Sequence, residues 1–227
     1  MVDVPPNELA DLLGLIVHDL RNPAATLGAN ISFFKDAASA PPNEDEDLRE
    51  AVEDMEAALL DLRRGLDHLG WIARWIGGQE PVQIADGDVV TAVEKAAAQV
   101  PAVSTHIEAP VRPLRARGGG TALRLAELLL LNSGTHGQGS EVRLSVWREG
   151  EHVVMEMRDG GPAIAEELRE VAFDAGGQAQ LKGKAGGRYS RAAGLLAVRA
   201  IADAMGAYLA AGGVDGDAWF RIRFTAL

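Results

Sequence analysis

The sequence predicts a helical part followed by an α/β part. Within residues 1–79, two long stretches repeat apolar residues at alternating steps of three and four, the spacing of helices that pack along a seam. From residue 80 onward, short alternating segments are separated by apolar helical stretches and glycine breaks. We therefore expect an N-terminal antiparallel helical hairpin over residues 1–79 and an α/β sandwich over residues 80–227, with helices on one face of the sheet.

Each helix of the predicted hairpin has its own apolar seam. The first begins after Pro5-Pro6 with Asn7 as N-cap, and it ends within residues 37–47, which are rich in proline and acidic residues. Its seam is formed by Leu9, Leu13, Ile16, Leu20, Ala24, Leu27, Ile31 and Phe34. The second ends at Gly77-Gly78, because glycine readily adopts the conformation that terminates a helix. Its seam is formed by Leu48, Val52, Met55, Leu59, Leu62, Leu66, Leu69, Ala73 and Ile76.

Both helices also carry apolar residues beside their seams. Examples are Leu12, Val17, Phe33, Leu60, Trp71, Ile72 and Trp75. One hairpin cannot cover so much apolar surface, so we expect two chains to pair as a homodimer with a four-helix bundle.

The α/β part is predicted from alternation, apolar runs and turn residues. Strands are expected at 81–84, 105–108, 114–116, 141–147, 152–158, 208–211 and 219–224, and helices at 89–100, 122–133, 165–171 and 192–205. Thr121 is expected to cap the helix that follows it. Residues 176–191 show no apolar periodicity but carry Lys182, Lys184, Arg188 and Arg191. This segment is either a solvated loop or a lid that meets an anionic ligand.

Composition excludes several classes of function. The formal charge of −11 and the pI near 4.9 argue against binding to a phosphate backbone. The absence of cysteine excludes disulfides, thiolate chemistry and cysteine-based zinc sites. The N-terminus lacks the pattern of a signal peptide, and no apolar run is long enough to span a membrane. We expect a cytoplasmic protein without nucleic-acid binding or membrane insertion.

The most distinctive motif lies inside the first predicted helix. Residues 18–23 read His-Asp-Leu-Arg-Asn-Pro. Pro23 interrupts the helical hydrogen bonds one turn upstream, at His18 and Asp19, and Asn22 lies on the same helical face as His18. Taken alone, the motif is compatible with a surface histidine in a kinked helix. His68, on the second helix, is expected to be a packing or surface residue.

The whole chain resembles the catalytic core of a two-component sensor histidine kinase. In that family, a dimerisation and phosphotransfer hairpin precedes a nucleotide-binding domain of the GHKL type shared with gyrase and Hsp90. Residues 18–23 match the family's H-box residue for residue. The resemblance implies that His18 accepts the phosphoryl group and that Asp19 orients the ring and accepts its proton. It also implies that Asn22 helps to place a water that dephosphorylates the partner, a response-regulator receiver domain.

The resemblance further implies an ATP site with Mg²⁺. Asn132 aligns with the asparagine that holds Mg²⁺, and Asp159 with the aspartate that accepts a hydrogen bond from the adenine amino group. The other residues assigned to the nucleotide in this way are His136, Gly161, Lys182, Lys184, Arg188 and Gly194.

Several family positions carry other residues here. They are Leu128 in place of an asparagine, Thr135 in place of a lysine, and Ala163 and Ala192 in place of glycines. Two hypotheses stay open as a result. One is an active histidine kinase that autophosphorylates His18 from ATP. The other is an ATP-independent histidine phosphotransferase, or a pseudokinase that binds a receiver domain.

Overall fold

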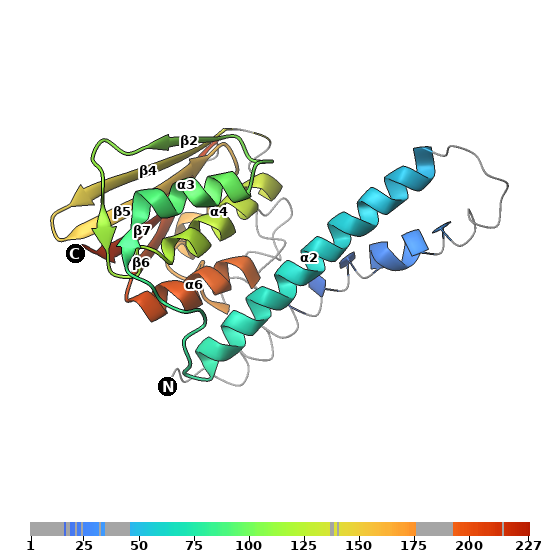
Figure 1. Cartoon of the computed structure of the whole chain (residues 1–227), viewed down its shortest axis with the longest axis horizontal. Helices are drawn as coiled ribbons and strands as arrows, with labels where there is room; N and C mark the ends of the chain where they lie inside the picture. The colour runs from blue at the N-terminus through green and yellow to red at the C-terminus, as the bar shows by residue number, and fades with distance from the viewer. Residues whose placement is uncertain are drawn as a thin grey trace.

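A computed structural model describes most of the α/β part and much of the helical part. The described residues are 16, 19–20, 22–23, 25–31, 33–34, 46–136, 139, 141–175, 193–214 and 216–227. The elements, the longer of which are labelled in Figure 1, are α2 (Glu46–Ile76), β1 (Gly87–Asp88), α3 (Val89–Gln99), β2 (Thr105–Glu108), β3 (Arg115–Ala116), α4 (Ala122–His136), β4 (Val142–Glu149), β5 (His152–Asp159), the 3₁₀ helix η1 (Glu166–Leu168), α6 (Ala193–Met205), β6 (Tyr208–Val214) and β7 (Asp217–Thr225). No helix among these residues is long and apolar enough to cross a membrane.

The helical part contains α2 and helical residues between 16 and 34. Leu20 lies against α2 at Gly65, where an added Cβ would come within 2.7 Å of the leucine side chain. Ten residues further on, the Asn30 amide donates to the Ala51 carbonyl at 3.2 Å. The described helical residues before 35 are therefore antiparallel to α2. The connection at 35–45 lies outside the described residues, so the complete hairpin and its dimer stay predictions.

Helix α2 ends just before Gly77-Gly78, as the sequence predicts. Gly78 has a positive φ of 70°, and its N–H donates to the Trp75 carbonyl at 2.9 Å. The Gln79 N–H donates to the Arg74 carbonyl at 2.8 Å. This pair of bonds satisfies carbonyls that a helix end leaves open, and the left-handed residue is a glycine because it has no Cβ to clash.

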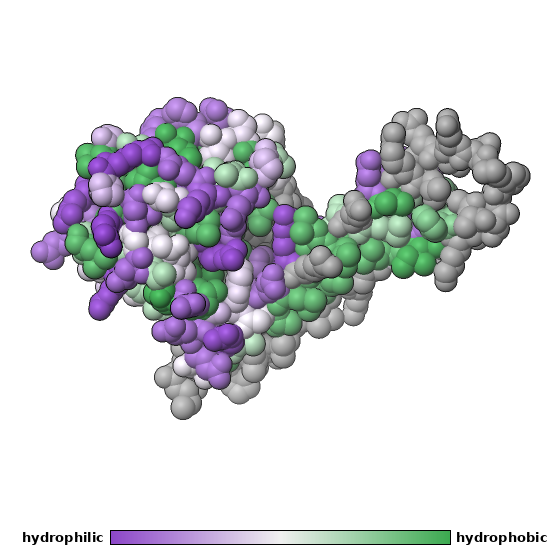
Figure 2. Space-filling view, viewed as in Figure 1, coloured by the Kyte–Doolittle hydropathy of each residue, from purple (hydrophilic) through white to green (hydrophobic). Residues whose placement is uncertain are grey.

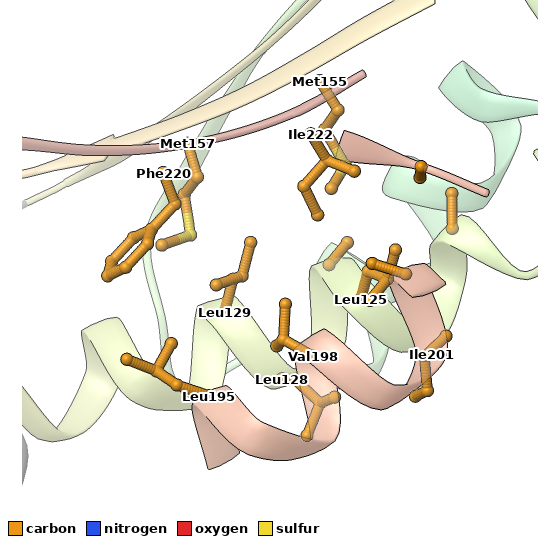
Figure 3. Packing of buried hydrophobic residues seen from close by; sticks show 14 of the residues in the cluster. Leu125, Leu128, Leu129, Met155, Met157, Leu195, Val198, Ile201, Phe220 and Ile222 are labelled. Atoms are coloured by element: carbon orange, nitrogen blue, oxygen red, sulfur yellow. The ribbon is translucent and has the colours of Figure 1, made fainter. Parts of the chain in front are cut away.

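The α/β part is a sandwich of a five-stranded sheet and a helical layer, and β1 and β3 pair in a separate two-stranded antiparallel sheet. The sheet has the strand order β2-β4-β5-β7-β6, in which only β2 and β4 pair in parallel. Helices α3, α4 and α6 lie together on one side of it (Figure 1). Between the layers, Leu125 and Leu129 of α4 point toward the strands that carry Met157 and Phe220 (Figure 3). All four side chains are at least 98% buried, so this layer is the core of the domain.

Two predicted elements take a different form. Residues 81–84 pair in no described strand: 81–82 form a bend, and the segment is held at the turn that precedes α4, where the Gly120 N–H donates to the Ala85 carbonyl at 2.9 Å. The Thr121 hydroxyl accepts from the Ala85 N–H at 2.8 Å, so it ties down this segment and is not seen as a helix cap. The predicted helix 165–171 is only the 3₁₀ helix η1, because its N-cap Ala165 has no side chain to bind the free N–H groups.

The N-terminus of α3 provides a test of local stability. One Asp88 carboxylate oxygen accepts from the Thr91 N–H at 3.1 Å and the Thr91 hydroxyl at 2.6 Å, and the other accepts from the Leu114 N–H at 2.7 Å. Burial alone would raise the pKa of Asp88, but these hydrogen bonds hold its pKa below the ordinary 3.8. The carboxylate therefore joins α3 to the segment before β3.

We expect Asp88→Ala to lower the free energy of unfolding by about 1–2 kcal/mol at pH 7. Because the pKa of Asp88 is lowered by folding, its contribution is fully present above the ordinary aspartate pKa and is lost as the pH falls through the lower folded value. The gap between variant and wild type should therefore narrow in strong acid, as measured by urea unfolding across pH. Glu141→Ala, at an exposed position before β4, is the control. An equal loss of stability in this variant would contradict the capping role of Asp88.

Candidate functional site

Helix α4 presents two different faces to its surroundings. Leu125, Leu129 and Ser133 are four residues apart and share the face toward the sheet, where each is at least 98% buried. Leu128, Leu131 and Asn132 line a cavity on the side toward the helical part. Neighbouring residues 132 and 133 therefore point in directions about 100° apart around the helix, one toward the cavity and the other toward the sheet.

The inner face leads to Asp159 at the end of β5. This aspartate is only 4% exposed. Its Oδ2 accepts a hydrogen bond from the Ser133 hydroxyl, and its Oδ1 accepts from the Gly161 N–H at 2.9 Å. The strand thus ends in a carboxylate that is held by α4 on one side and by the following loop on the other.

The outer face leads to a cavity of about 380 Å³ between the two parts of the chain. The helical part contributes residues on both sides of the H-box histidine, namely Ile16, Asp19, Leu20 and Pro23, together with Asp61, Arg64, Gly65 and His68 of α2. The α/β part contributes residues 99–103 and the described residues Leu128, Leu131, Asn132, Gly134 and Gly194. The H-box helix and the predicted nucleotide residues of the same chain therefore share one cavity.

Apolar packing joins the two parts around this cavity. Ile16 of the first helix is 3% exposed and Ile72 of α2 is 1% exposed, and both belong to one apolar cluster with Leu128, which is 5% exposed. On the α2 wall, Arg64 pairs with Asp61 at 3.6 Å, and the rings of His68 and Trp71 lie 5.6 Å apart. The expectation that His68 is a packing or surface residue agrees with this ring contact.

Two features of the cavity suit an anionic ligand. Gly194 lies in the first turn of α6, where N–H groups are available to an anion, and a Cβ built on it would meet no atom within 4 Å. The Asn132 side-chain nitrogen is buried without a hydrogen-bond partner among the described residues. The amide and the open backbone at the helix N-terminus can therefore contact phosphate oxygens.

The fit to a metal ion is narrower. Within the described ranges, no group of three histidine or acidic residues is placed to hold an ion. Asn132 offers one amide oxygen, and Leu128, one turn earlier on the same helix face, offers only a hydrocarbon. The cavity side of α4 thus provides a single side-chain ligand of the kind that Mg²⁺ prefers, so an ion bound there would depend largely on water and phosphate oxygens.

The predicted site residues fall into four groups. Asp19, Asn132 and Gly194 line the cavity, whereas Asn22 is exposed. Asp159 and Gly161 meet each other at the end of β5. His18, Lys182, Lys184 and Arg188 lie outside the described residues, as does the side chain of His136.

Ser133 is a site residue that the sequence analysis missed. A signal was available, because a polar residue continues the apolar spacing of Leu125 and Leu129 onto the buried face. Its partner Asp159 is 26 residues away in the chain, so pattern alone could not identify the contact.

Comparisons with known proteins agree with this architecture. The family model of the histidine kinase-, DNA gyrase B-, and HSP90-like ATPase matches residues 120–226. A search of curated protein sequences found no match.

Solved structures of histidine kinases share the fold. The histidine kinase AdeS of Acinetobacter baumannii aligns over 92% of this chain and 97% of its own, with 16% identity and a TM-score of 0.66. The histidine kinase ThkA, solved in complex with the response regulator TrrA, aligns over 96% of this chain and 62% of its own, with 14% identity and a TM-score of 0.63. Full-length ShkA in complex with AMPPNP aligns over 99% of this chain and 47% of its own, with 17% identity and a TM-score of 0.59.

The family match covers the elements that carry Asn132, Asp159 and Gly194, and the structural likeness extends over the preceding helices. Residues 120–226 of this chain are therefore similar to the ATPase domains of the histidine kinase-, DNA gyrase B-, and HSP90-like family.

Proposed function

We propose that the protein is a histidine kinase of a two-component system that acts in the cytoplasm. It autophosphorylates His18 from ATP and passes the phosphoryl group to an aspartate of a response-regulator receiver domain. The cavity shared by Asp19, Asn132 and Gly194 carries this proposal, because it brings the neighbour of His18 next to the residues assigned to the phosphates. The likeness to AdeS and ThkA supports the same class of protein.

The candidate site residues have the following roles in this reaction. Asp159 accepts a hydrogen bond from the adenine amino group, and the N-terminus of α6 at Gly194 contacts the phosphates. A neutral ring nitrogen of His18 attacks the γ-phosphorus; a P–N bond forms, the bond to the β-phosphate oxygen breaks, and ADP leaves. Asp19 takes the ring proton. Asn132 would hold Mg²⁺, which neutralises charge on the phosphates.

A second candidate function follows from Leu128. This side chain is buried at a position where the kinase family has a metal-binding asparagine. An ATP-independent histidine phosphotransferase would need His18, Asp19 and a receiver-binding surface but no metal site. On this hypothesis the group reaches His18 from a phosphorylated receiver domain.

One labelling experiment separates the two functions. The whole protein is incubated either with γ-³²P-labelled ATP and Mg²⁺ or with a labelled phospho-receiver domain without ATP. Acid-labile label from ATP on wild type, absent from His18→Gln and retained in His68→Gln, is the result expected of the kinase. Label from the phospho-receiver alone would replace the kinase with the phosphotransferase. Label from neither donor would exclude both.

We also propose that the protein works as a homodimer through its helical part. Several large apolar side chains of these helices are at least 40% exposed, namely Ile31, Phe33, Phe34, Leu59, Leu60 and Leu66. Figure 2 shows hydrophobic surface along the helical arm that extends from the α/β part. Water-exposed apolar area of this size is typical of an interface, and a second copy would cover it as a four-helix bundle.

Light scattering combined with size exclusion should therefore give twice the chain mass of 24.0 kDa. Leu60→Lys places a charge on the exposed apolar face and should shift the protein toward monomer. Tyr208→Lys, at an exposed position on β6, is the matched control and should leave the mass unchanged. A monomeric wild type would contradict the dimer.

A further inference from the structure

Ser133 is a buried polar residue for which the phosphotransfer reaction as described has no role. Its side chain is 2% exposed on the face of α4 that packs on the sheet. Its hydroxyl donates to Oδ2 of Asp159 and lies 3.8 Å from the sulfur of Met157. A hydroxyl among the apolar side chains of this layer is costly unless it is hydrogen-bonded, and Asp159 provides the acceptor.

Asp159 accepts a hydrogen bond at each of its carboxylate oxygens. The Ser133 hydroxyl binds Oδ2, and the Gly161 N–H binds Oδ1 at 2.9 Å. The two donors come from different elements, α4 and the loop after β5, so together they fix the rotation of the carboxylate. A carboxylate has about four acceptor positions, so accepting these two bonds is compatible with accepting a third.

We propose that Ser133 is a positioning residue that holds Asp159 ready to accept a hydrogen bond from an exocyclic amino group. It thereby sets a preference for adenine over bases with a carbonyl oxygen at the same position. Adenine carries an amino donor there, whereas a carbonyl oxygen would face the carboxylate as a second acceptor. A site built to hydrogen-bond one group discriminates strongly against an analogue that lacks it. The inference rests on the proposed binding of ATP by this domain.

The position of Ser133 within α4 links the two ends of the site. Asn132 lines the cavity at the phosphate end, and the next residue, about 100° around the helix, binds the base-end carboxylate of Asp159. Helix α4 therefore fixes the spacing between the two ends. A purely structural role of Ser133 would instead affect all nucleotides equally, because it would act only through the stability of the domain.

The test compares two nucleotides that differ at the base. ADP and inosine diphosphate, whose base has an oxygen in place of the amino group, are titrated calorimetrically into the whole protein. Wild type should prefer ADP. Ser133→Ala should lower the affinity for ADP about tenfold, because one oriented hydrogen bond is lost. The affinity for inosine diphosphate should stay nearly unchanged. Ser133→Cys keeps almost the same volume with a weaker donor and should show the same selective loss, in case the alanine variant folds poorly.

Ser145→Ala is the matched control. Ser145 also donates to a carboxylate, that of Glu108 at 3.3 Å, but on the exposed face of the sheet. It should retain the full preference for ADP. Equal weakening of both nucleotides, or unchanged preference, in the Ser133 variants would overturn the positioning role and leave the kinase proposal standing. Absence of ADP binding by wild type would overturn both.

Discussion

Glu156→Ala is expected to lower the free energy of unfolding by about 2–3 kcal/mol. Glu156 lies at the centre of the outer face of the sheet, and its side chain is only 7% exposed. Arg158 donates to it at 2.6 Å, and the Arg221 Nε donates at 2.8 Å. Removing the carboxylate leaves two partly buried guanidinium groups with less compensating charge, while an exposed pair would cost far less.

The other contacts of the two arginines explain why the expected loss of stability is not larger. Arg158 keeps a second partner, Asp217, at 2.9 Å. The guanidinium of Arg221 lies 4.8 Å from the ring centre of Trp219 and 5.7 Å from that of Trp147, which also favours a cation. Both arginines are about one third exposed or less, so water reaches them in part.

Urea unfolding measures this difference, with Glu149→Ala as the control. Glu149 pairs with Arg223 at 3.1 Å on the same sheet, but the two side chains are 51% and 44% exposed. The control should therefore change stability by no more than about 0.5 kcal/mol. If both variants lost the same amount, the burial of Glu156 would not be the reason for its contribution.

The sequence predicted best where a pattern is long and local. Alternation over β4, β5 and β7 identified the central strands, and the apolar seam with Gly78 identified α2 and its end. Each of these signals arises from neighbours in the chain, because strand and helix periodicities follow from backbone geometry.

Two short elements, at 81–84 and 165–171, were predicted wrongly, because distant contacts decide their form. The segment 81–84 alternates like a strand, but side-chain and backbone bonds to Thr121 and Gly120, more than 30 residues away, take the place of a ladder. Residues 165–171 read as a helix, but Arg169 binds the carbonyls of Ile164 and Gly213 and holds the chain in turns after η1. Propensity over a few residues cannot compete with such tertiary bonds.

The same distinction applies to the candidate site. Asn132, Asp159 and Gly194 could be assigned from motifs. In the structure, Asn132 and Gly194 line the cavity, and Asp159 is hydrogen-bonded to Ser133 of α4. The shared cavity with Asp19 could not be predicted, because it depends on how the helical part packs on α4 through Ile16 and Leu128.

Leu128→Asn is expected to raise the Mg²⁺-dependent affinity for ATP and to lower the stability of the fold. The asparagine would lie one turn before Asn132 on the same face of α4 and would add a second amide oxygen for Mg²⁺. We expect the Mg²⁺-dependent part of ATP affinity to rise about tenfold, which corresponds to one added favourable contact. Stability should fall by about 2–4 kcal/mol, because Leu128 is 5% exposed among apolar neighbours that join the two parts of the chain.

Calorimetric titration of ATP with and without Mg²⁺ tests the binding, and urea unfolding tests the stability. Leu131→Asn is the control, since Leu131 lines the same cavity but directly precedes Asn132 and so points about 100° around the helix from it, not one turn before it. It should leave the Mg²⁺ dependence unchanged. A gain confined to Leu128→Asn would mean that one hydrocarbon side chain limits the metal site of this domain. If Leu128→Asn lost stability without any gain in Mg²⁺-dependent affinity, Leu128 would matter for apolar packing between the two parts and not for the metal.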